Sequence, residues 1–203
     1  MDFKSFLLFA KSRRSVREYT DQKVDREKIE QMVEAASWAP SNHNRQGWKF
    51  IVFEDTQEIR TLAKKTREFI KKSLEGAHKL VAGKAEELIY YSGVFDRAPV
   101  LILAMHKKSP SVSKHIVDSA TSELACGEVL STAMACQNLI LAGKAMGLGT
   151  CIMTAPLLAG TVWRSLENLP MGFEPTCLIT LGYPAETHQS PRRKKLEHII
   201  EYR

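Results

Sequence analysis

Residues 123–153 read ELACGEVLSTAMACQNLILAGKAMGLGTCIM, the most hydrophobic stretch of the chain. Its first part has almost no polar face, so the pattern predicts a helix buried on all sides, either inside a large core or between subunits. Gly147 and Gly149 are expected to end this helix, because glycine readily adopts the left-handed conformation found at helix C-termini. A short β-like run, Leu148 to Met153, follows directly. We expect the other elements to pack around this helix and its exit.

Short strands separate the remaining helical stretches of the sequence. Apolar residues at helical spacing predict helices near residues 2–12, 25–38, 56–74 and 156–166, and a further helix within 76–96. Apolar and β-branched runs predict strands at residues 48–53, 99–105 and 177–182, and the tail 196–202 is a further candidate strand, reaching away from the body. Because the helices come in runs, the sequence predicts a single α+β domain over residues 1–203 rather than a regular βαβ alternation.

Composition and charge place the chain among soluble globular proteins. It has 203 residues, of which 44% are hydrophobic, and a formal net charge of +6 from 29 basic and 23 acidic residues. No apolar run is long enough to span a membrane, and residues 1–14 lack a signal-peptide pattern, so we expect a cytoplasmic protein without membrane contact. Basic residues within 60–84 flank an apolar stripe and are expected to form a solvated helix face. Without a recognition motif, the charge does not indicate nucleic-acid binding.

The cysteines and histidines are scattered, which argues against a metal site. The four cysteines form no Cys-x-x-Cys pair and have no histidine beside them, so we expect buried thiols rather than zinc ligands or disulfides. The chain also lacks a Walker loop, and Ile152 stands where the third glycine of a dinucleotide fingerprint would be. No catalytic triad can be assembled from residue spacing. The chemistry is therefore expected to come from a cofactor rather than from side chains.

Basic side chains form two clusters near the ends of the sequence. The clusters are Arg13, Arg14, Ser15 and Arg17 near the start, and Arg192, Arg193 and Lys194 near the end. Arginine side chains bind phosphate oxygens bidentately, and a serine hydroxyl adds a further donor. If the clusters met in space, they would hold a phosphate monoester without a glycine-rich loop. The alternative is that both are ordinary surface charge.

A polar loop before the first predicted strand is the other candidate for ligand binding. It reads Pro40-Ser41-Asn42-His43-Asn44-Arg45-Gln46 and is dense in amide and hydroxyl groups. Such groups suit the edge of a ligand with alternating donors and acceptors. The alternative is a simple helix-to-strand turn, where Asn and Ser are common.

Taken together, these motifs resemble the nitroreductase family of flavin mononucleotide (FMN) enzymes. The matching stretches follow the family's order and spacing and span nearly the whole chain: residues 13–17, 39–48, 137–142 leading to 147–151, and 193–197. The resemblance implies an α+β three-layer sandwich with a central mixed, mainly antiparallel sheet, built as an intertwined homodimer. Two FMN sites would lie at the subunit interface. The tail from about residue 190 to residue 203 would reach the partner subunit.

The resemblance also implies cofactor contacts, residue by residue. Phosphate contacts fall on Arg13, Arg14 and Ser15, with Arg192 or Arg193 from the tail. Arg17 falls beside the pyrimidine edge of the flavin, where a cation would stabilise the anionic reduced form. The residues implied to reach the flavin of the other subunit are Pro40, Ser41, Asn42 and Asn44. The residues whose backbone N–H groups are implied to face flavin N5 and O4 are Met153, Thr154 and Ala155.

This chain departs from the family pattern at several positions. Gly47 and Lys195 stand where the family commonly has proline, and Thr154 and Ala155 replace the acidic residue and glycine of larger members. The family's mid-chain ribityl contact matches no residue within 76–96. That span also tends to form the substrate lid, so the sequence does not define the acceptor.

The implied activity is that of an FMN-dependent oxidoreductase without a catalytic side chain. NADPH or NADH would reduce FMN at N5, leave, and be replaced by a nitroaromatic, quinone or similar conjugated acceptor in a ping-pong exchange. One alternative is a specialised flavin enzyme of the same fold, acting in flavin fragmentation or reductive dehalogenation. Another is a non-enzymatic flavin-binding protein. Bleaching by a nicotinamide cofactor and turnover with an acceptor distinguish these alternatives.

Overall fold

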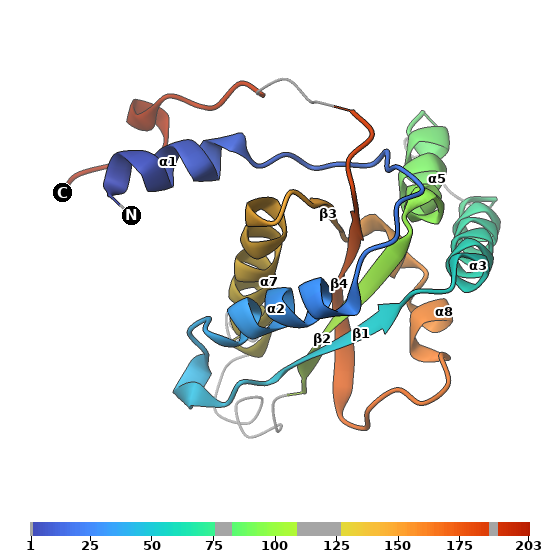
Figure 1. Ribbon diagram of the computed structural model, residues 1–203. Coiled ribbons are helices and arrows are strands. Elements are labelled where there is room, and N and C mark those ends of the chain that lie inside the picture. The colour runs from blue at the N-terminus through green and yellow to red at the C-terminus, as the bar shows by residue number, and fades with distance from the viewer. Residues whose placement is uncertain (1, 76–82, 109–126, 187–190) are drawn as a thin grey trace.

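The computed structural model describes residues 2–75, 83–108, 127–186 and 191–203 (Figure 1). The helices in these ranges are α1 (Phe3–Ser12), α2 (Arg26–Ser37), α3 (Thr56–Leu74), α5 (Ala85–Gly93), α7 (Gly127–Ala145) and α8 (Gly160–Arg164). The strands are β1 (Trp48–Phe53), β2 (Val100–Lys107), β3 (Gly149–Met153) and β4 (Phe173–Gly182). Short 3-10 helices are η1 (Asn42–Asn44), η2 (Val94–Arg97), η4 (Ala155–Leu158) and η5 (Leu196–His198).

The four described strands form one sheet in the order β1-β2-β4-β3, with every neighbouring pair antiparallel. Side chains of β2 alternate between its faces, so Ile102 packs with α2 and α7 while Leu103 packs with α3 and α8. Helices thus cover both faces of the sheet (Figure 1). This arrangement confirms the predicted α+β sandwich with a mainly antiparallel sheet. A parallel contact is present as an isolated bridge between Ser15 and Thr150.

Helix α7 is the helix that the long apolar stretch predicts. Cys136 and Leu139 are buried in the core that α7 shares with α2 and the sheet. The opposite face is open in the single chain, where Leu130 is 59% exposed and Met134 is 40% exposed. The helix is therefore not buried on all sides within this chain, because it lies in an outer layer of the sandwich. Its expected start, between residues 117 and 123, lies outside the described residues.

Two glycines shape the exit from α7, for different reasons. Gly147 has a φ of 77°, the left-handed conformation expected at the end of a helix. Gly149 keeps an ordinary φ, but a Cβ added there would lie 2.8 Å from the Val16 side chain. The prediction of a helix-ending glycine is therefore right for Gly147 and wrong for Gly149. Gly149 instead lets the N-terminal segment approach β3 closely.

The other predicted elements are present, with differences in their bounds and an exception in the tail. β4 begins at Phe173, four residues before the predicted strand, and the helix expected over residues 156–166 is divided into η4 and α8. β1 and α3 have the predicted bounds, and α5 is the described part of the helix expected within 76–96. Residues 76–82 lie outside the described ranges. The tail contains the 3-10 helix η5 rather than a strand. A strand needs a neighbouring strand to pair its backbone N–H and C=O groups. Among the described residues, no strand lies beside the tail.

Candidate functional site

The segment after α1 runs beside β3. Ser15 forms a parallel bridge with Thr150, and the Val16 N–H donates to the Thr150 carbonyl over 2.9 Å. Arg13 ends α1 in an extended conformation. Arg13 and Arg14 therefore lie close to the start of β3 and to the exit of α7, although these segments are far apart in the sequence.

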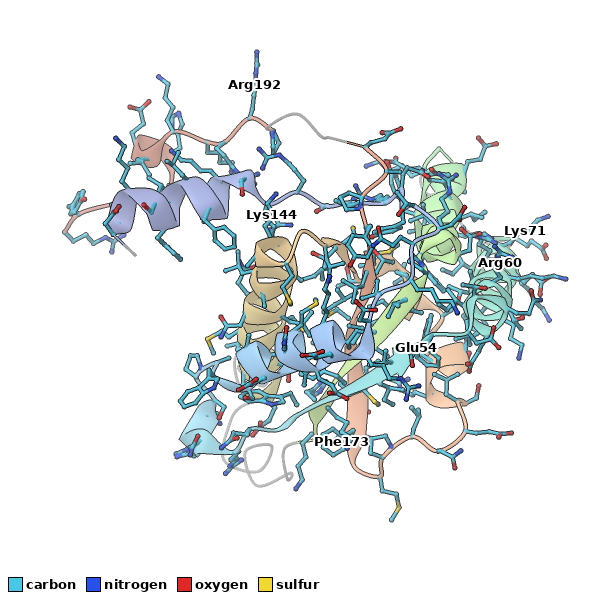
Figure 2. All side chains as sticks on the ribbon, viewed as in Figure 1. Glu54, Arg60, Lys71, Lys144, Phe173 and Arg192 are labelled. Atoms are coloured by element: carbon cyan, nitrogen blue, oxygen red, sulfur yellow. The ribbon has the colours of Figure 1, made fainter. Side chains whose placement is uncertain are left out.

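A cavity of about 190 Å³ opens where these segments meet. Its lining includes three basic side chains, Arg13, Arg14 and Lys144, and one acidic side chain, Glu186. Figure 2 shows Lys144 at the C-terminal end of α7. Nη1 of Arg14 donates to the carbonyl of Lys11 over 2.6 Å, which holds this arginine at the end of α1. The excess of positive charge suits an anionic group such as a phosphate.

Arg17 follows on the same segment and lies against α5. The central carbon of its guanidinium is 6.0 Å from the centre of the Tyr91 ring, the range of a cation–π contact. Burial raises the pKa of the Cys151 thiol on β3, and the charges of Arg17 and Arg13 and a hydrogen bond with Ser15 oppose that rise. The positive charge of Arg17 therefore acts at β3. With its raised pKa, Cys151 is a buried neutral thiol rather than a nucleophile.

Beyond Thr150, the outer edge of β3 is open. Among the described residues the only strand beside β3 is β4, and the outer edge is paired at Thr150 alone. Backbone groups alternate in direction along a strand, so the N–H of Ile152 points to the same side as the Thr150 carbonyl. Thr154 lies just beyond β3, and its N–H is on the opposite side of the peptide unit from the Met153 carbonyl, which faces β4. Met153 is buried, and Ala155 begins η4. The predicted contact segment thus presents its outward backbone donor at Thr154.

The polar loop is anchored at the opposite end of α7. The Asn42 N–H donates to the Ser131 hydroxyl over 3.0 Å. Nη1 of Arg45 lies 3.2 Å from Oε1 of Glu128, which is buried in the first turn of α7. Both contacts fix the loop to the N-terminal end of α7.

Within the loop, the backbone is held in an unusual shape. The Ser41 hydroxyl accepts a hydrogen bond from the Gln46 N–H over 3.0 Å. His43, Asn44 and Gln46 all have positive φ values, which only a well-supported turn maintains. The amide side chains of Asn42 and Asn44 are exposed. The loop is therefore a built structure that offers polar groups outward, beyond what a simple turn requires.

Helix α7 separates the predicted site residues into two groups. Arg13, Arg14, Ser15 and Arg17 lie along β3 together with residues 153–155, whereas residues 40–44 lie at the other end of the helix. The 19 residues of α7 span about 28 Å at about 1.5 Å per residue. One chain therefore does not bring both groups to a single small ligand.

The predicted tail contacts do not join either group in the single chain. Arg192 and Arg193 are exposed, and the lining of the 190 Å³ cavity includes neither. Figure 2 shows the Arg192 side chain pointing away from the body of the molecule.

The structure adds three residues that sequence reasoning did not select. Lys144 lines the basic cavity, and its charge near the end of an apolar helix was a usable signal. Glu128 anchors the polar loop, and it is likewise a charged residue within the apolar stretch. Tyr91 contacts Arg17 across two elements, which no local pattern could indicate.

A larger cavity of about 340 Å³ lies elsewhere and contains none of the predicted site residues. Two of its acidic groups form ion pairs with arginines outside the cavity, since Glu54 pairs with Arg26 at 2.6 Å and Asp96 pairs with Arg67 at 2.8 Å.

Among the described residues, no group of His, Cys, Asp and Glu is arranged to hold a metal ion. None of the helices in those ranges is both long and apolar enough to cross a membrane.

The sequence belongs to the nitroreductase family, whose characteristic pattern matches residues 10–183. Iodotyrosine deiodinase of Danio rerio is 28% identical over 193 residues, covering 93% of this chain and 63% of that protein. A Methanothermobacter thermautotrophicus protein, provisionally named an NADH dehydrogenase/NAD(P)H nitroreductase, is 29% identical over 87% of this chain and 75% of its own length. The chain thus spans less than two thirds of the deiodinase.

Solved structures agree with this assignment. A BluB-like flavoprotein from Clostridium difficile has a TM-score of 0.83 at 24% identity, with 100% of this chain and 99% of that chain covered. A provisionally named nitroreductase from Desulfovibrio desulfuricans, solved in complex with FMN, has a TM-score of 0.66 at 25% identity, with 97% and 96% covered. The first comparison establishes the shared fold, and the second concerns a relative with a bound flavin.

Proposed function

We propose that the protein is an FMN-dependent oxidoreductase whose cofactor lies along the open edge of β3. The pairing of Ser15 with Thr150 carries this proposal. It brings the basic cavity to the start of β3, and the outward backbone N–H of Thr154 follows the last residue of the same strand. A phosphate would enter the cavity while the flavin ring lay against the strand edge.

The residues present fit FMN in charge and in position. Arg13, Arg14 and Lys144 supply positive charge for the phosphate, Thr154 supplies a backbone donor, and Arg17 lies between them beside β3. The cavity of about 190 Å³ is smaller than the roughly 300–1,000 Å³ typical of small-molecule pockets, so it suits only the phosphate end. The ring would need further cover from outside the chain.

We infer that a second copy of this chain supplies that cover. Helix α1 has no buried residue, and large apolar side chains are exposed on several elements far apart in the sequence. Contiguous patches of exposed apolar side chains typically mark protein interfaces, and the exposed side chains of α1, α7 and the tail are the candidates for such a patch. Those on α1, just after α2, on α7 and in the tail include Phe3, Leu8, Trp38, Leu130, Leu196, Ile199 and Tyr202.

A homodimer would also unite the two groups of site residues. The length of α7 keeps the polar loop away from β3 of the same chain. If two copies pack against each other through the open face of α7, the loop of one copy can reach the β3 edge of the other. Residues 40–44 would then contact the flavin of the neighbouring subunit, and the tail would pack against that subunit.

When bound, FMN would take two electrons from NADPH or NADH and pass them to a nitroaromatic, a quinone or a similar conjugated acceptor. The residues of the chain would bind the cofactor, orient its ring and favour its reduced form. Arg17 would favour the anionic reduced cofactor, and the Thr154 N–H would orient the ring. The name of the M. thermautotrophicus relative supports a nicotinamide donor.

Reductive dehalogenation is the second candidate function, favoured by the similarity to iodotyrosine deiodinases. The relevant acceptor would be a halogenated phenol with an amino-acid group. The same β3 edge and the same cofactor would serve this reaction, so the acceptor distinguishes the two functions.

Spectroscopy of the purified protein tests the proposal directly. We expect a yellow protein whose flavin absorbance bleaches anaerobically on addition of NADPH or NADH and returns on addition of a nitroaromatic or quinone. Recovery with an iodotyrosine after chemical reduction, without bleaching by either nicotinamide, would select dehalogenation. A colourless protein that takes up no added FMN would contradict both functions.

A further inference from the structure

A closed set of contacts joins the N-terminal segment to α5. The Arg17 guanidinium lies over the Tyr91 ring at 6.0 Å, and Tyr91 meets Tyr90 edge to face at 5.2 Å between ring centres. Arg97 lies over the Tyr90 ring at 5.9 Å and forms an ion pair with Glu18. Because Glu18 directly follows Arg17, these contacts form a closed circuit that links the N-terminal segment to α5 and to the following 3-10 helix η2.

Within this circuit, Arg17 depends on Tyr91 for its position. Arginine has many rotamers, and holding one of them requires a contact. Among the described residues, Arg17 makes no ion pair or side-chain hydrogen bond, so the Tyr91 ring is its direct side-chain partner. The Tyr91 ring packs edge to face against the Tyr90 ring, and Arg97 lies over the Tyr90 ring.

We propose that Tyr91 is a positioning residue that holds the Arg17 charge beside the flavin and so sets how strongly the site favours the reduced cofactor. The proposal rests on the FMN-dependent function proposed above. Arg17 already acts electrostatically at β3, where its charge opposes the rise in the pKa of Cys151. The same charge would stabilise a negative charge that develops on a ring lying against β3.

The sign of the effect follows from electrostatics. Reduced flavin is anionic, so a fixed cation nearby binds it more tightly than the neutral oxidised form. Without the Tyr91 ring, the Arg17 side chain would spread over solvated rotamers and its mean charge at the flavin would fall. The ratio of reduced to oxidised FMN affinity, and with it the midpoint potential, should then decrease.

The test compares Tyr91→Leu with Tyr91→Phe in the full-length protein loaded with FMN. The measured quantity is the midpoint potential, obtained by anaerobic dye-coupled titration, together with the Kd of oxidised FMN. We expect Tyr91→Leu to lower the ratio of reduced to oxidised affinity about two- to fivefold, the factor of an exposed cation–π contact. Tyr91→Phe keeps the ring and should keep the potential.

A second pair of variants separates action through Arg17 from direct contact with the flavin. Arg17→Gln should lower the potential at least as much as Tyr91→Leu, and adding Tyr91→Leu to Arg17→Gln should change nothing further. Lys28→Gln is the control for loss of one positive charge, because Lys28 lies on α2, where it contacts the Tyr183 ring at 5.2 Å and donates a hydrogen bond to the Tyr183 hydroxyl over 2.7 Å. Its potential should equal that of the unmodified protein.

Several results would overturn the inference while leaving the proposed function intact. One is FMN binding with an unchanged potential in Tyr91→Leu; another is an equal shift in the presence and absence of Arg17. Tyr91 is about half exposed, so Tyr91→Gln provides a second test of ring removal if the leucine variant does not fold. Failure of the unmodified protein to bind FMN would overturn the proposed function and the inference together.

Discussion

Gly47 stands where the family usually has proline, and the packing of Glu128 accounts for the difference. A Cβ at position 47 would lie 2.6 Å from Oε2 of Glu128. That carboxylate is buried, and Oε2 has no hydrogen-bond partner among the described residues. Its other oxygen pairs with Arg45 of the polar loop. The glycine therefore makes room for the residue that anchors the loop.

Substituting this glycine should destabilise the fold through overpacking. We expect Gly47→Ala to lower the free energy of unfolding by about 1–3 kcal/mol, measured by urea denaturation. Glu128→Ala opens the space, so Gly47→Ala should cost much less in that background. Equal losses in the two backgrounds would show that the close contact does not govern this position.

Lys144 allows the phosphate end of the site to be tested separately from the ring. It lines the basic cavity together with Arg13 and Arg14, and it lies at the end of α7 rather than on the N-terminal segment. We expect Lys144→Gln to weaken FMN binding about tenfold, the order of one charge-assisted hydrogen bond. Riboflavin lacks the phosphate and should bind the variant and the parent equally. Isothermal titration with both ligands checks this, and equal weakening of both would place Lys144 elsewhere in the site.

At the scale of elements, α7 holds the sheet with one face and leaves the other uncovered. Cys136 and Leu139 face the core, whereas Leu130 and Met134 face solvent in the single chain. Burying the second face against another copy would explain why this sequence has no polar face. The same helix delivers the chain into β3, so dimer formation and cofactor binding should be linked.

A charge on the open face of α7 tests this linkage. We expect Leu130→Asp to release monomers and to lose bound flavin in parallel, since a buried unpaired carboxylate costs several kcal/mol at an interface. Size-exclusion chromatography with light scattering and the flavin-to-protein absorbance ratio measure the two effects. Met171→Asp is the control, because Met171 is 97% exposed and lies in the turn before β4. A stable monomer that keeps its flavin would separate the two properties.

Elements with local signals were predictable from the sequence, and those with distant causes were not. α3 shows an uninterrupted apolar stripe after an N-cap, Asp55, whose carboxylate accepts from the Gln57 N–H, and its predicted bounds are right. Gly149 was misread because its reason is the approach of Val16 from another part of the chain. The tail has an apolar pattern like that of a strand, but no described strand lies beside it. The contact between Tyr91 and Arg17 depends on how α5 packs against the N-terminal segment, and local sequence periodicity does not predict that packing.

At the scale of the whole molecule, the candidate site is divided between the two ends of α7. The family resemblance implies that each flavin contacts residues 13–17 of one subunit and residues 40–44 of the other, and within one chain the fold places these two groups at opposite ends of α7, a helix about 28 Å long. In a symmetric dimer, each complete site would then take one group from each subunit. A site shared between subunits therefore predicts an experimental result that differs from the result for a site within one chain.

Two defective variants should restore binding when their subunits mix. Arg14→Glu removes a positive charge from the residues that would bind the phosphate. Asn44→Asp changes the polar loop while keeping a residue type that tolerates positive φ. In a heterodimer, one site carries both defects and the other carries none. Random exchange after mild denaturation and refolding of equal amounts should therefore recover about a quarter of all sites in a two-fold symmetric dimer. Fluorescence titration with FMN counts those sites, and each variant refolded alone is the control. If both groups belonged to one chain, every subunit would retain a defect and mixing would restore no binding.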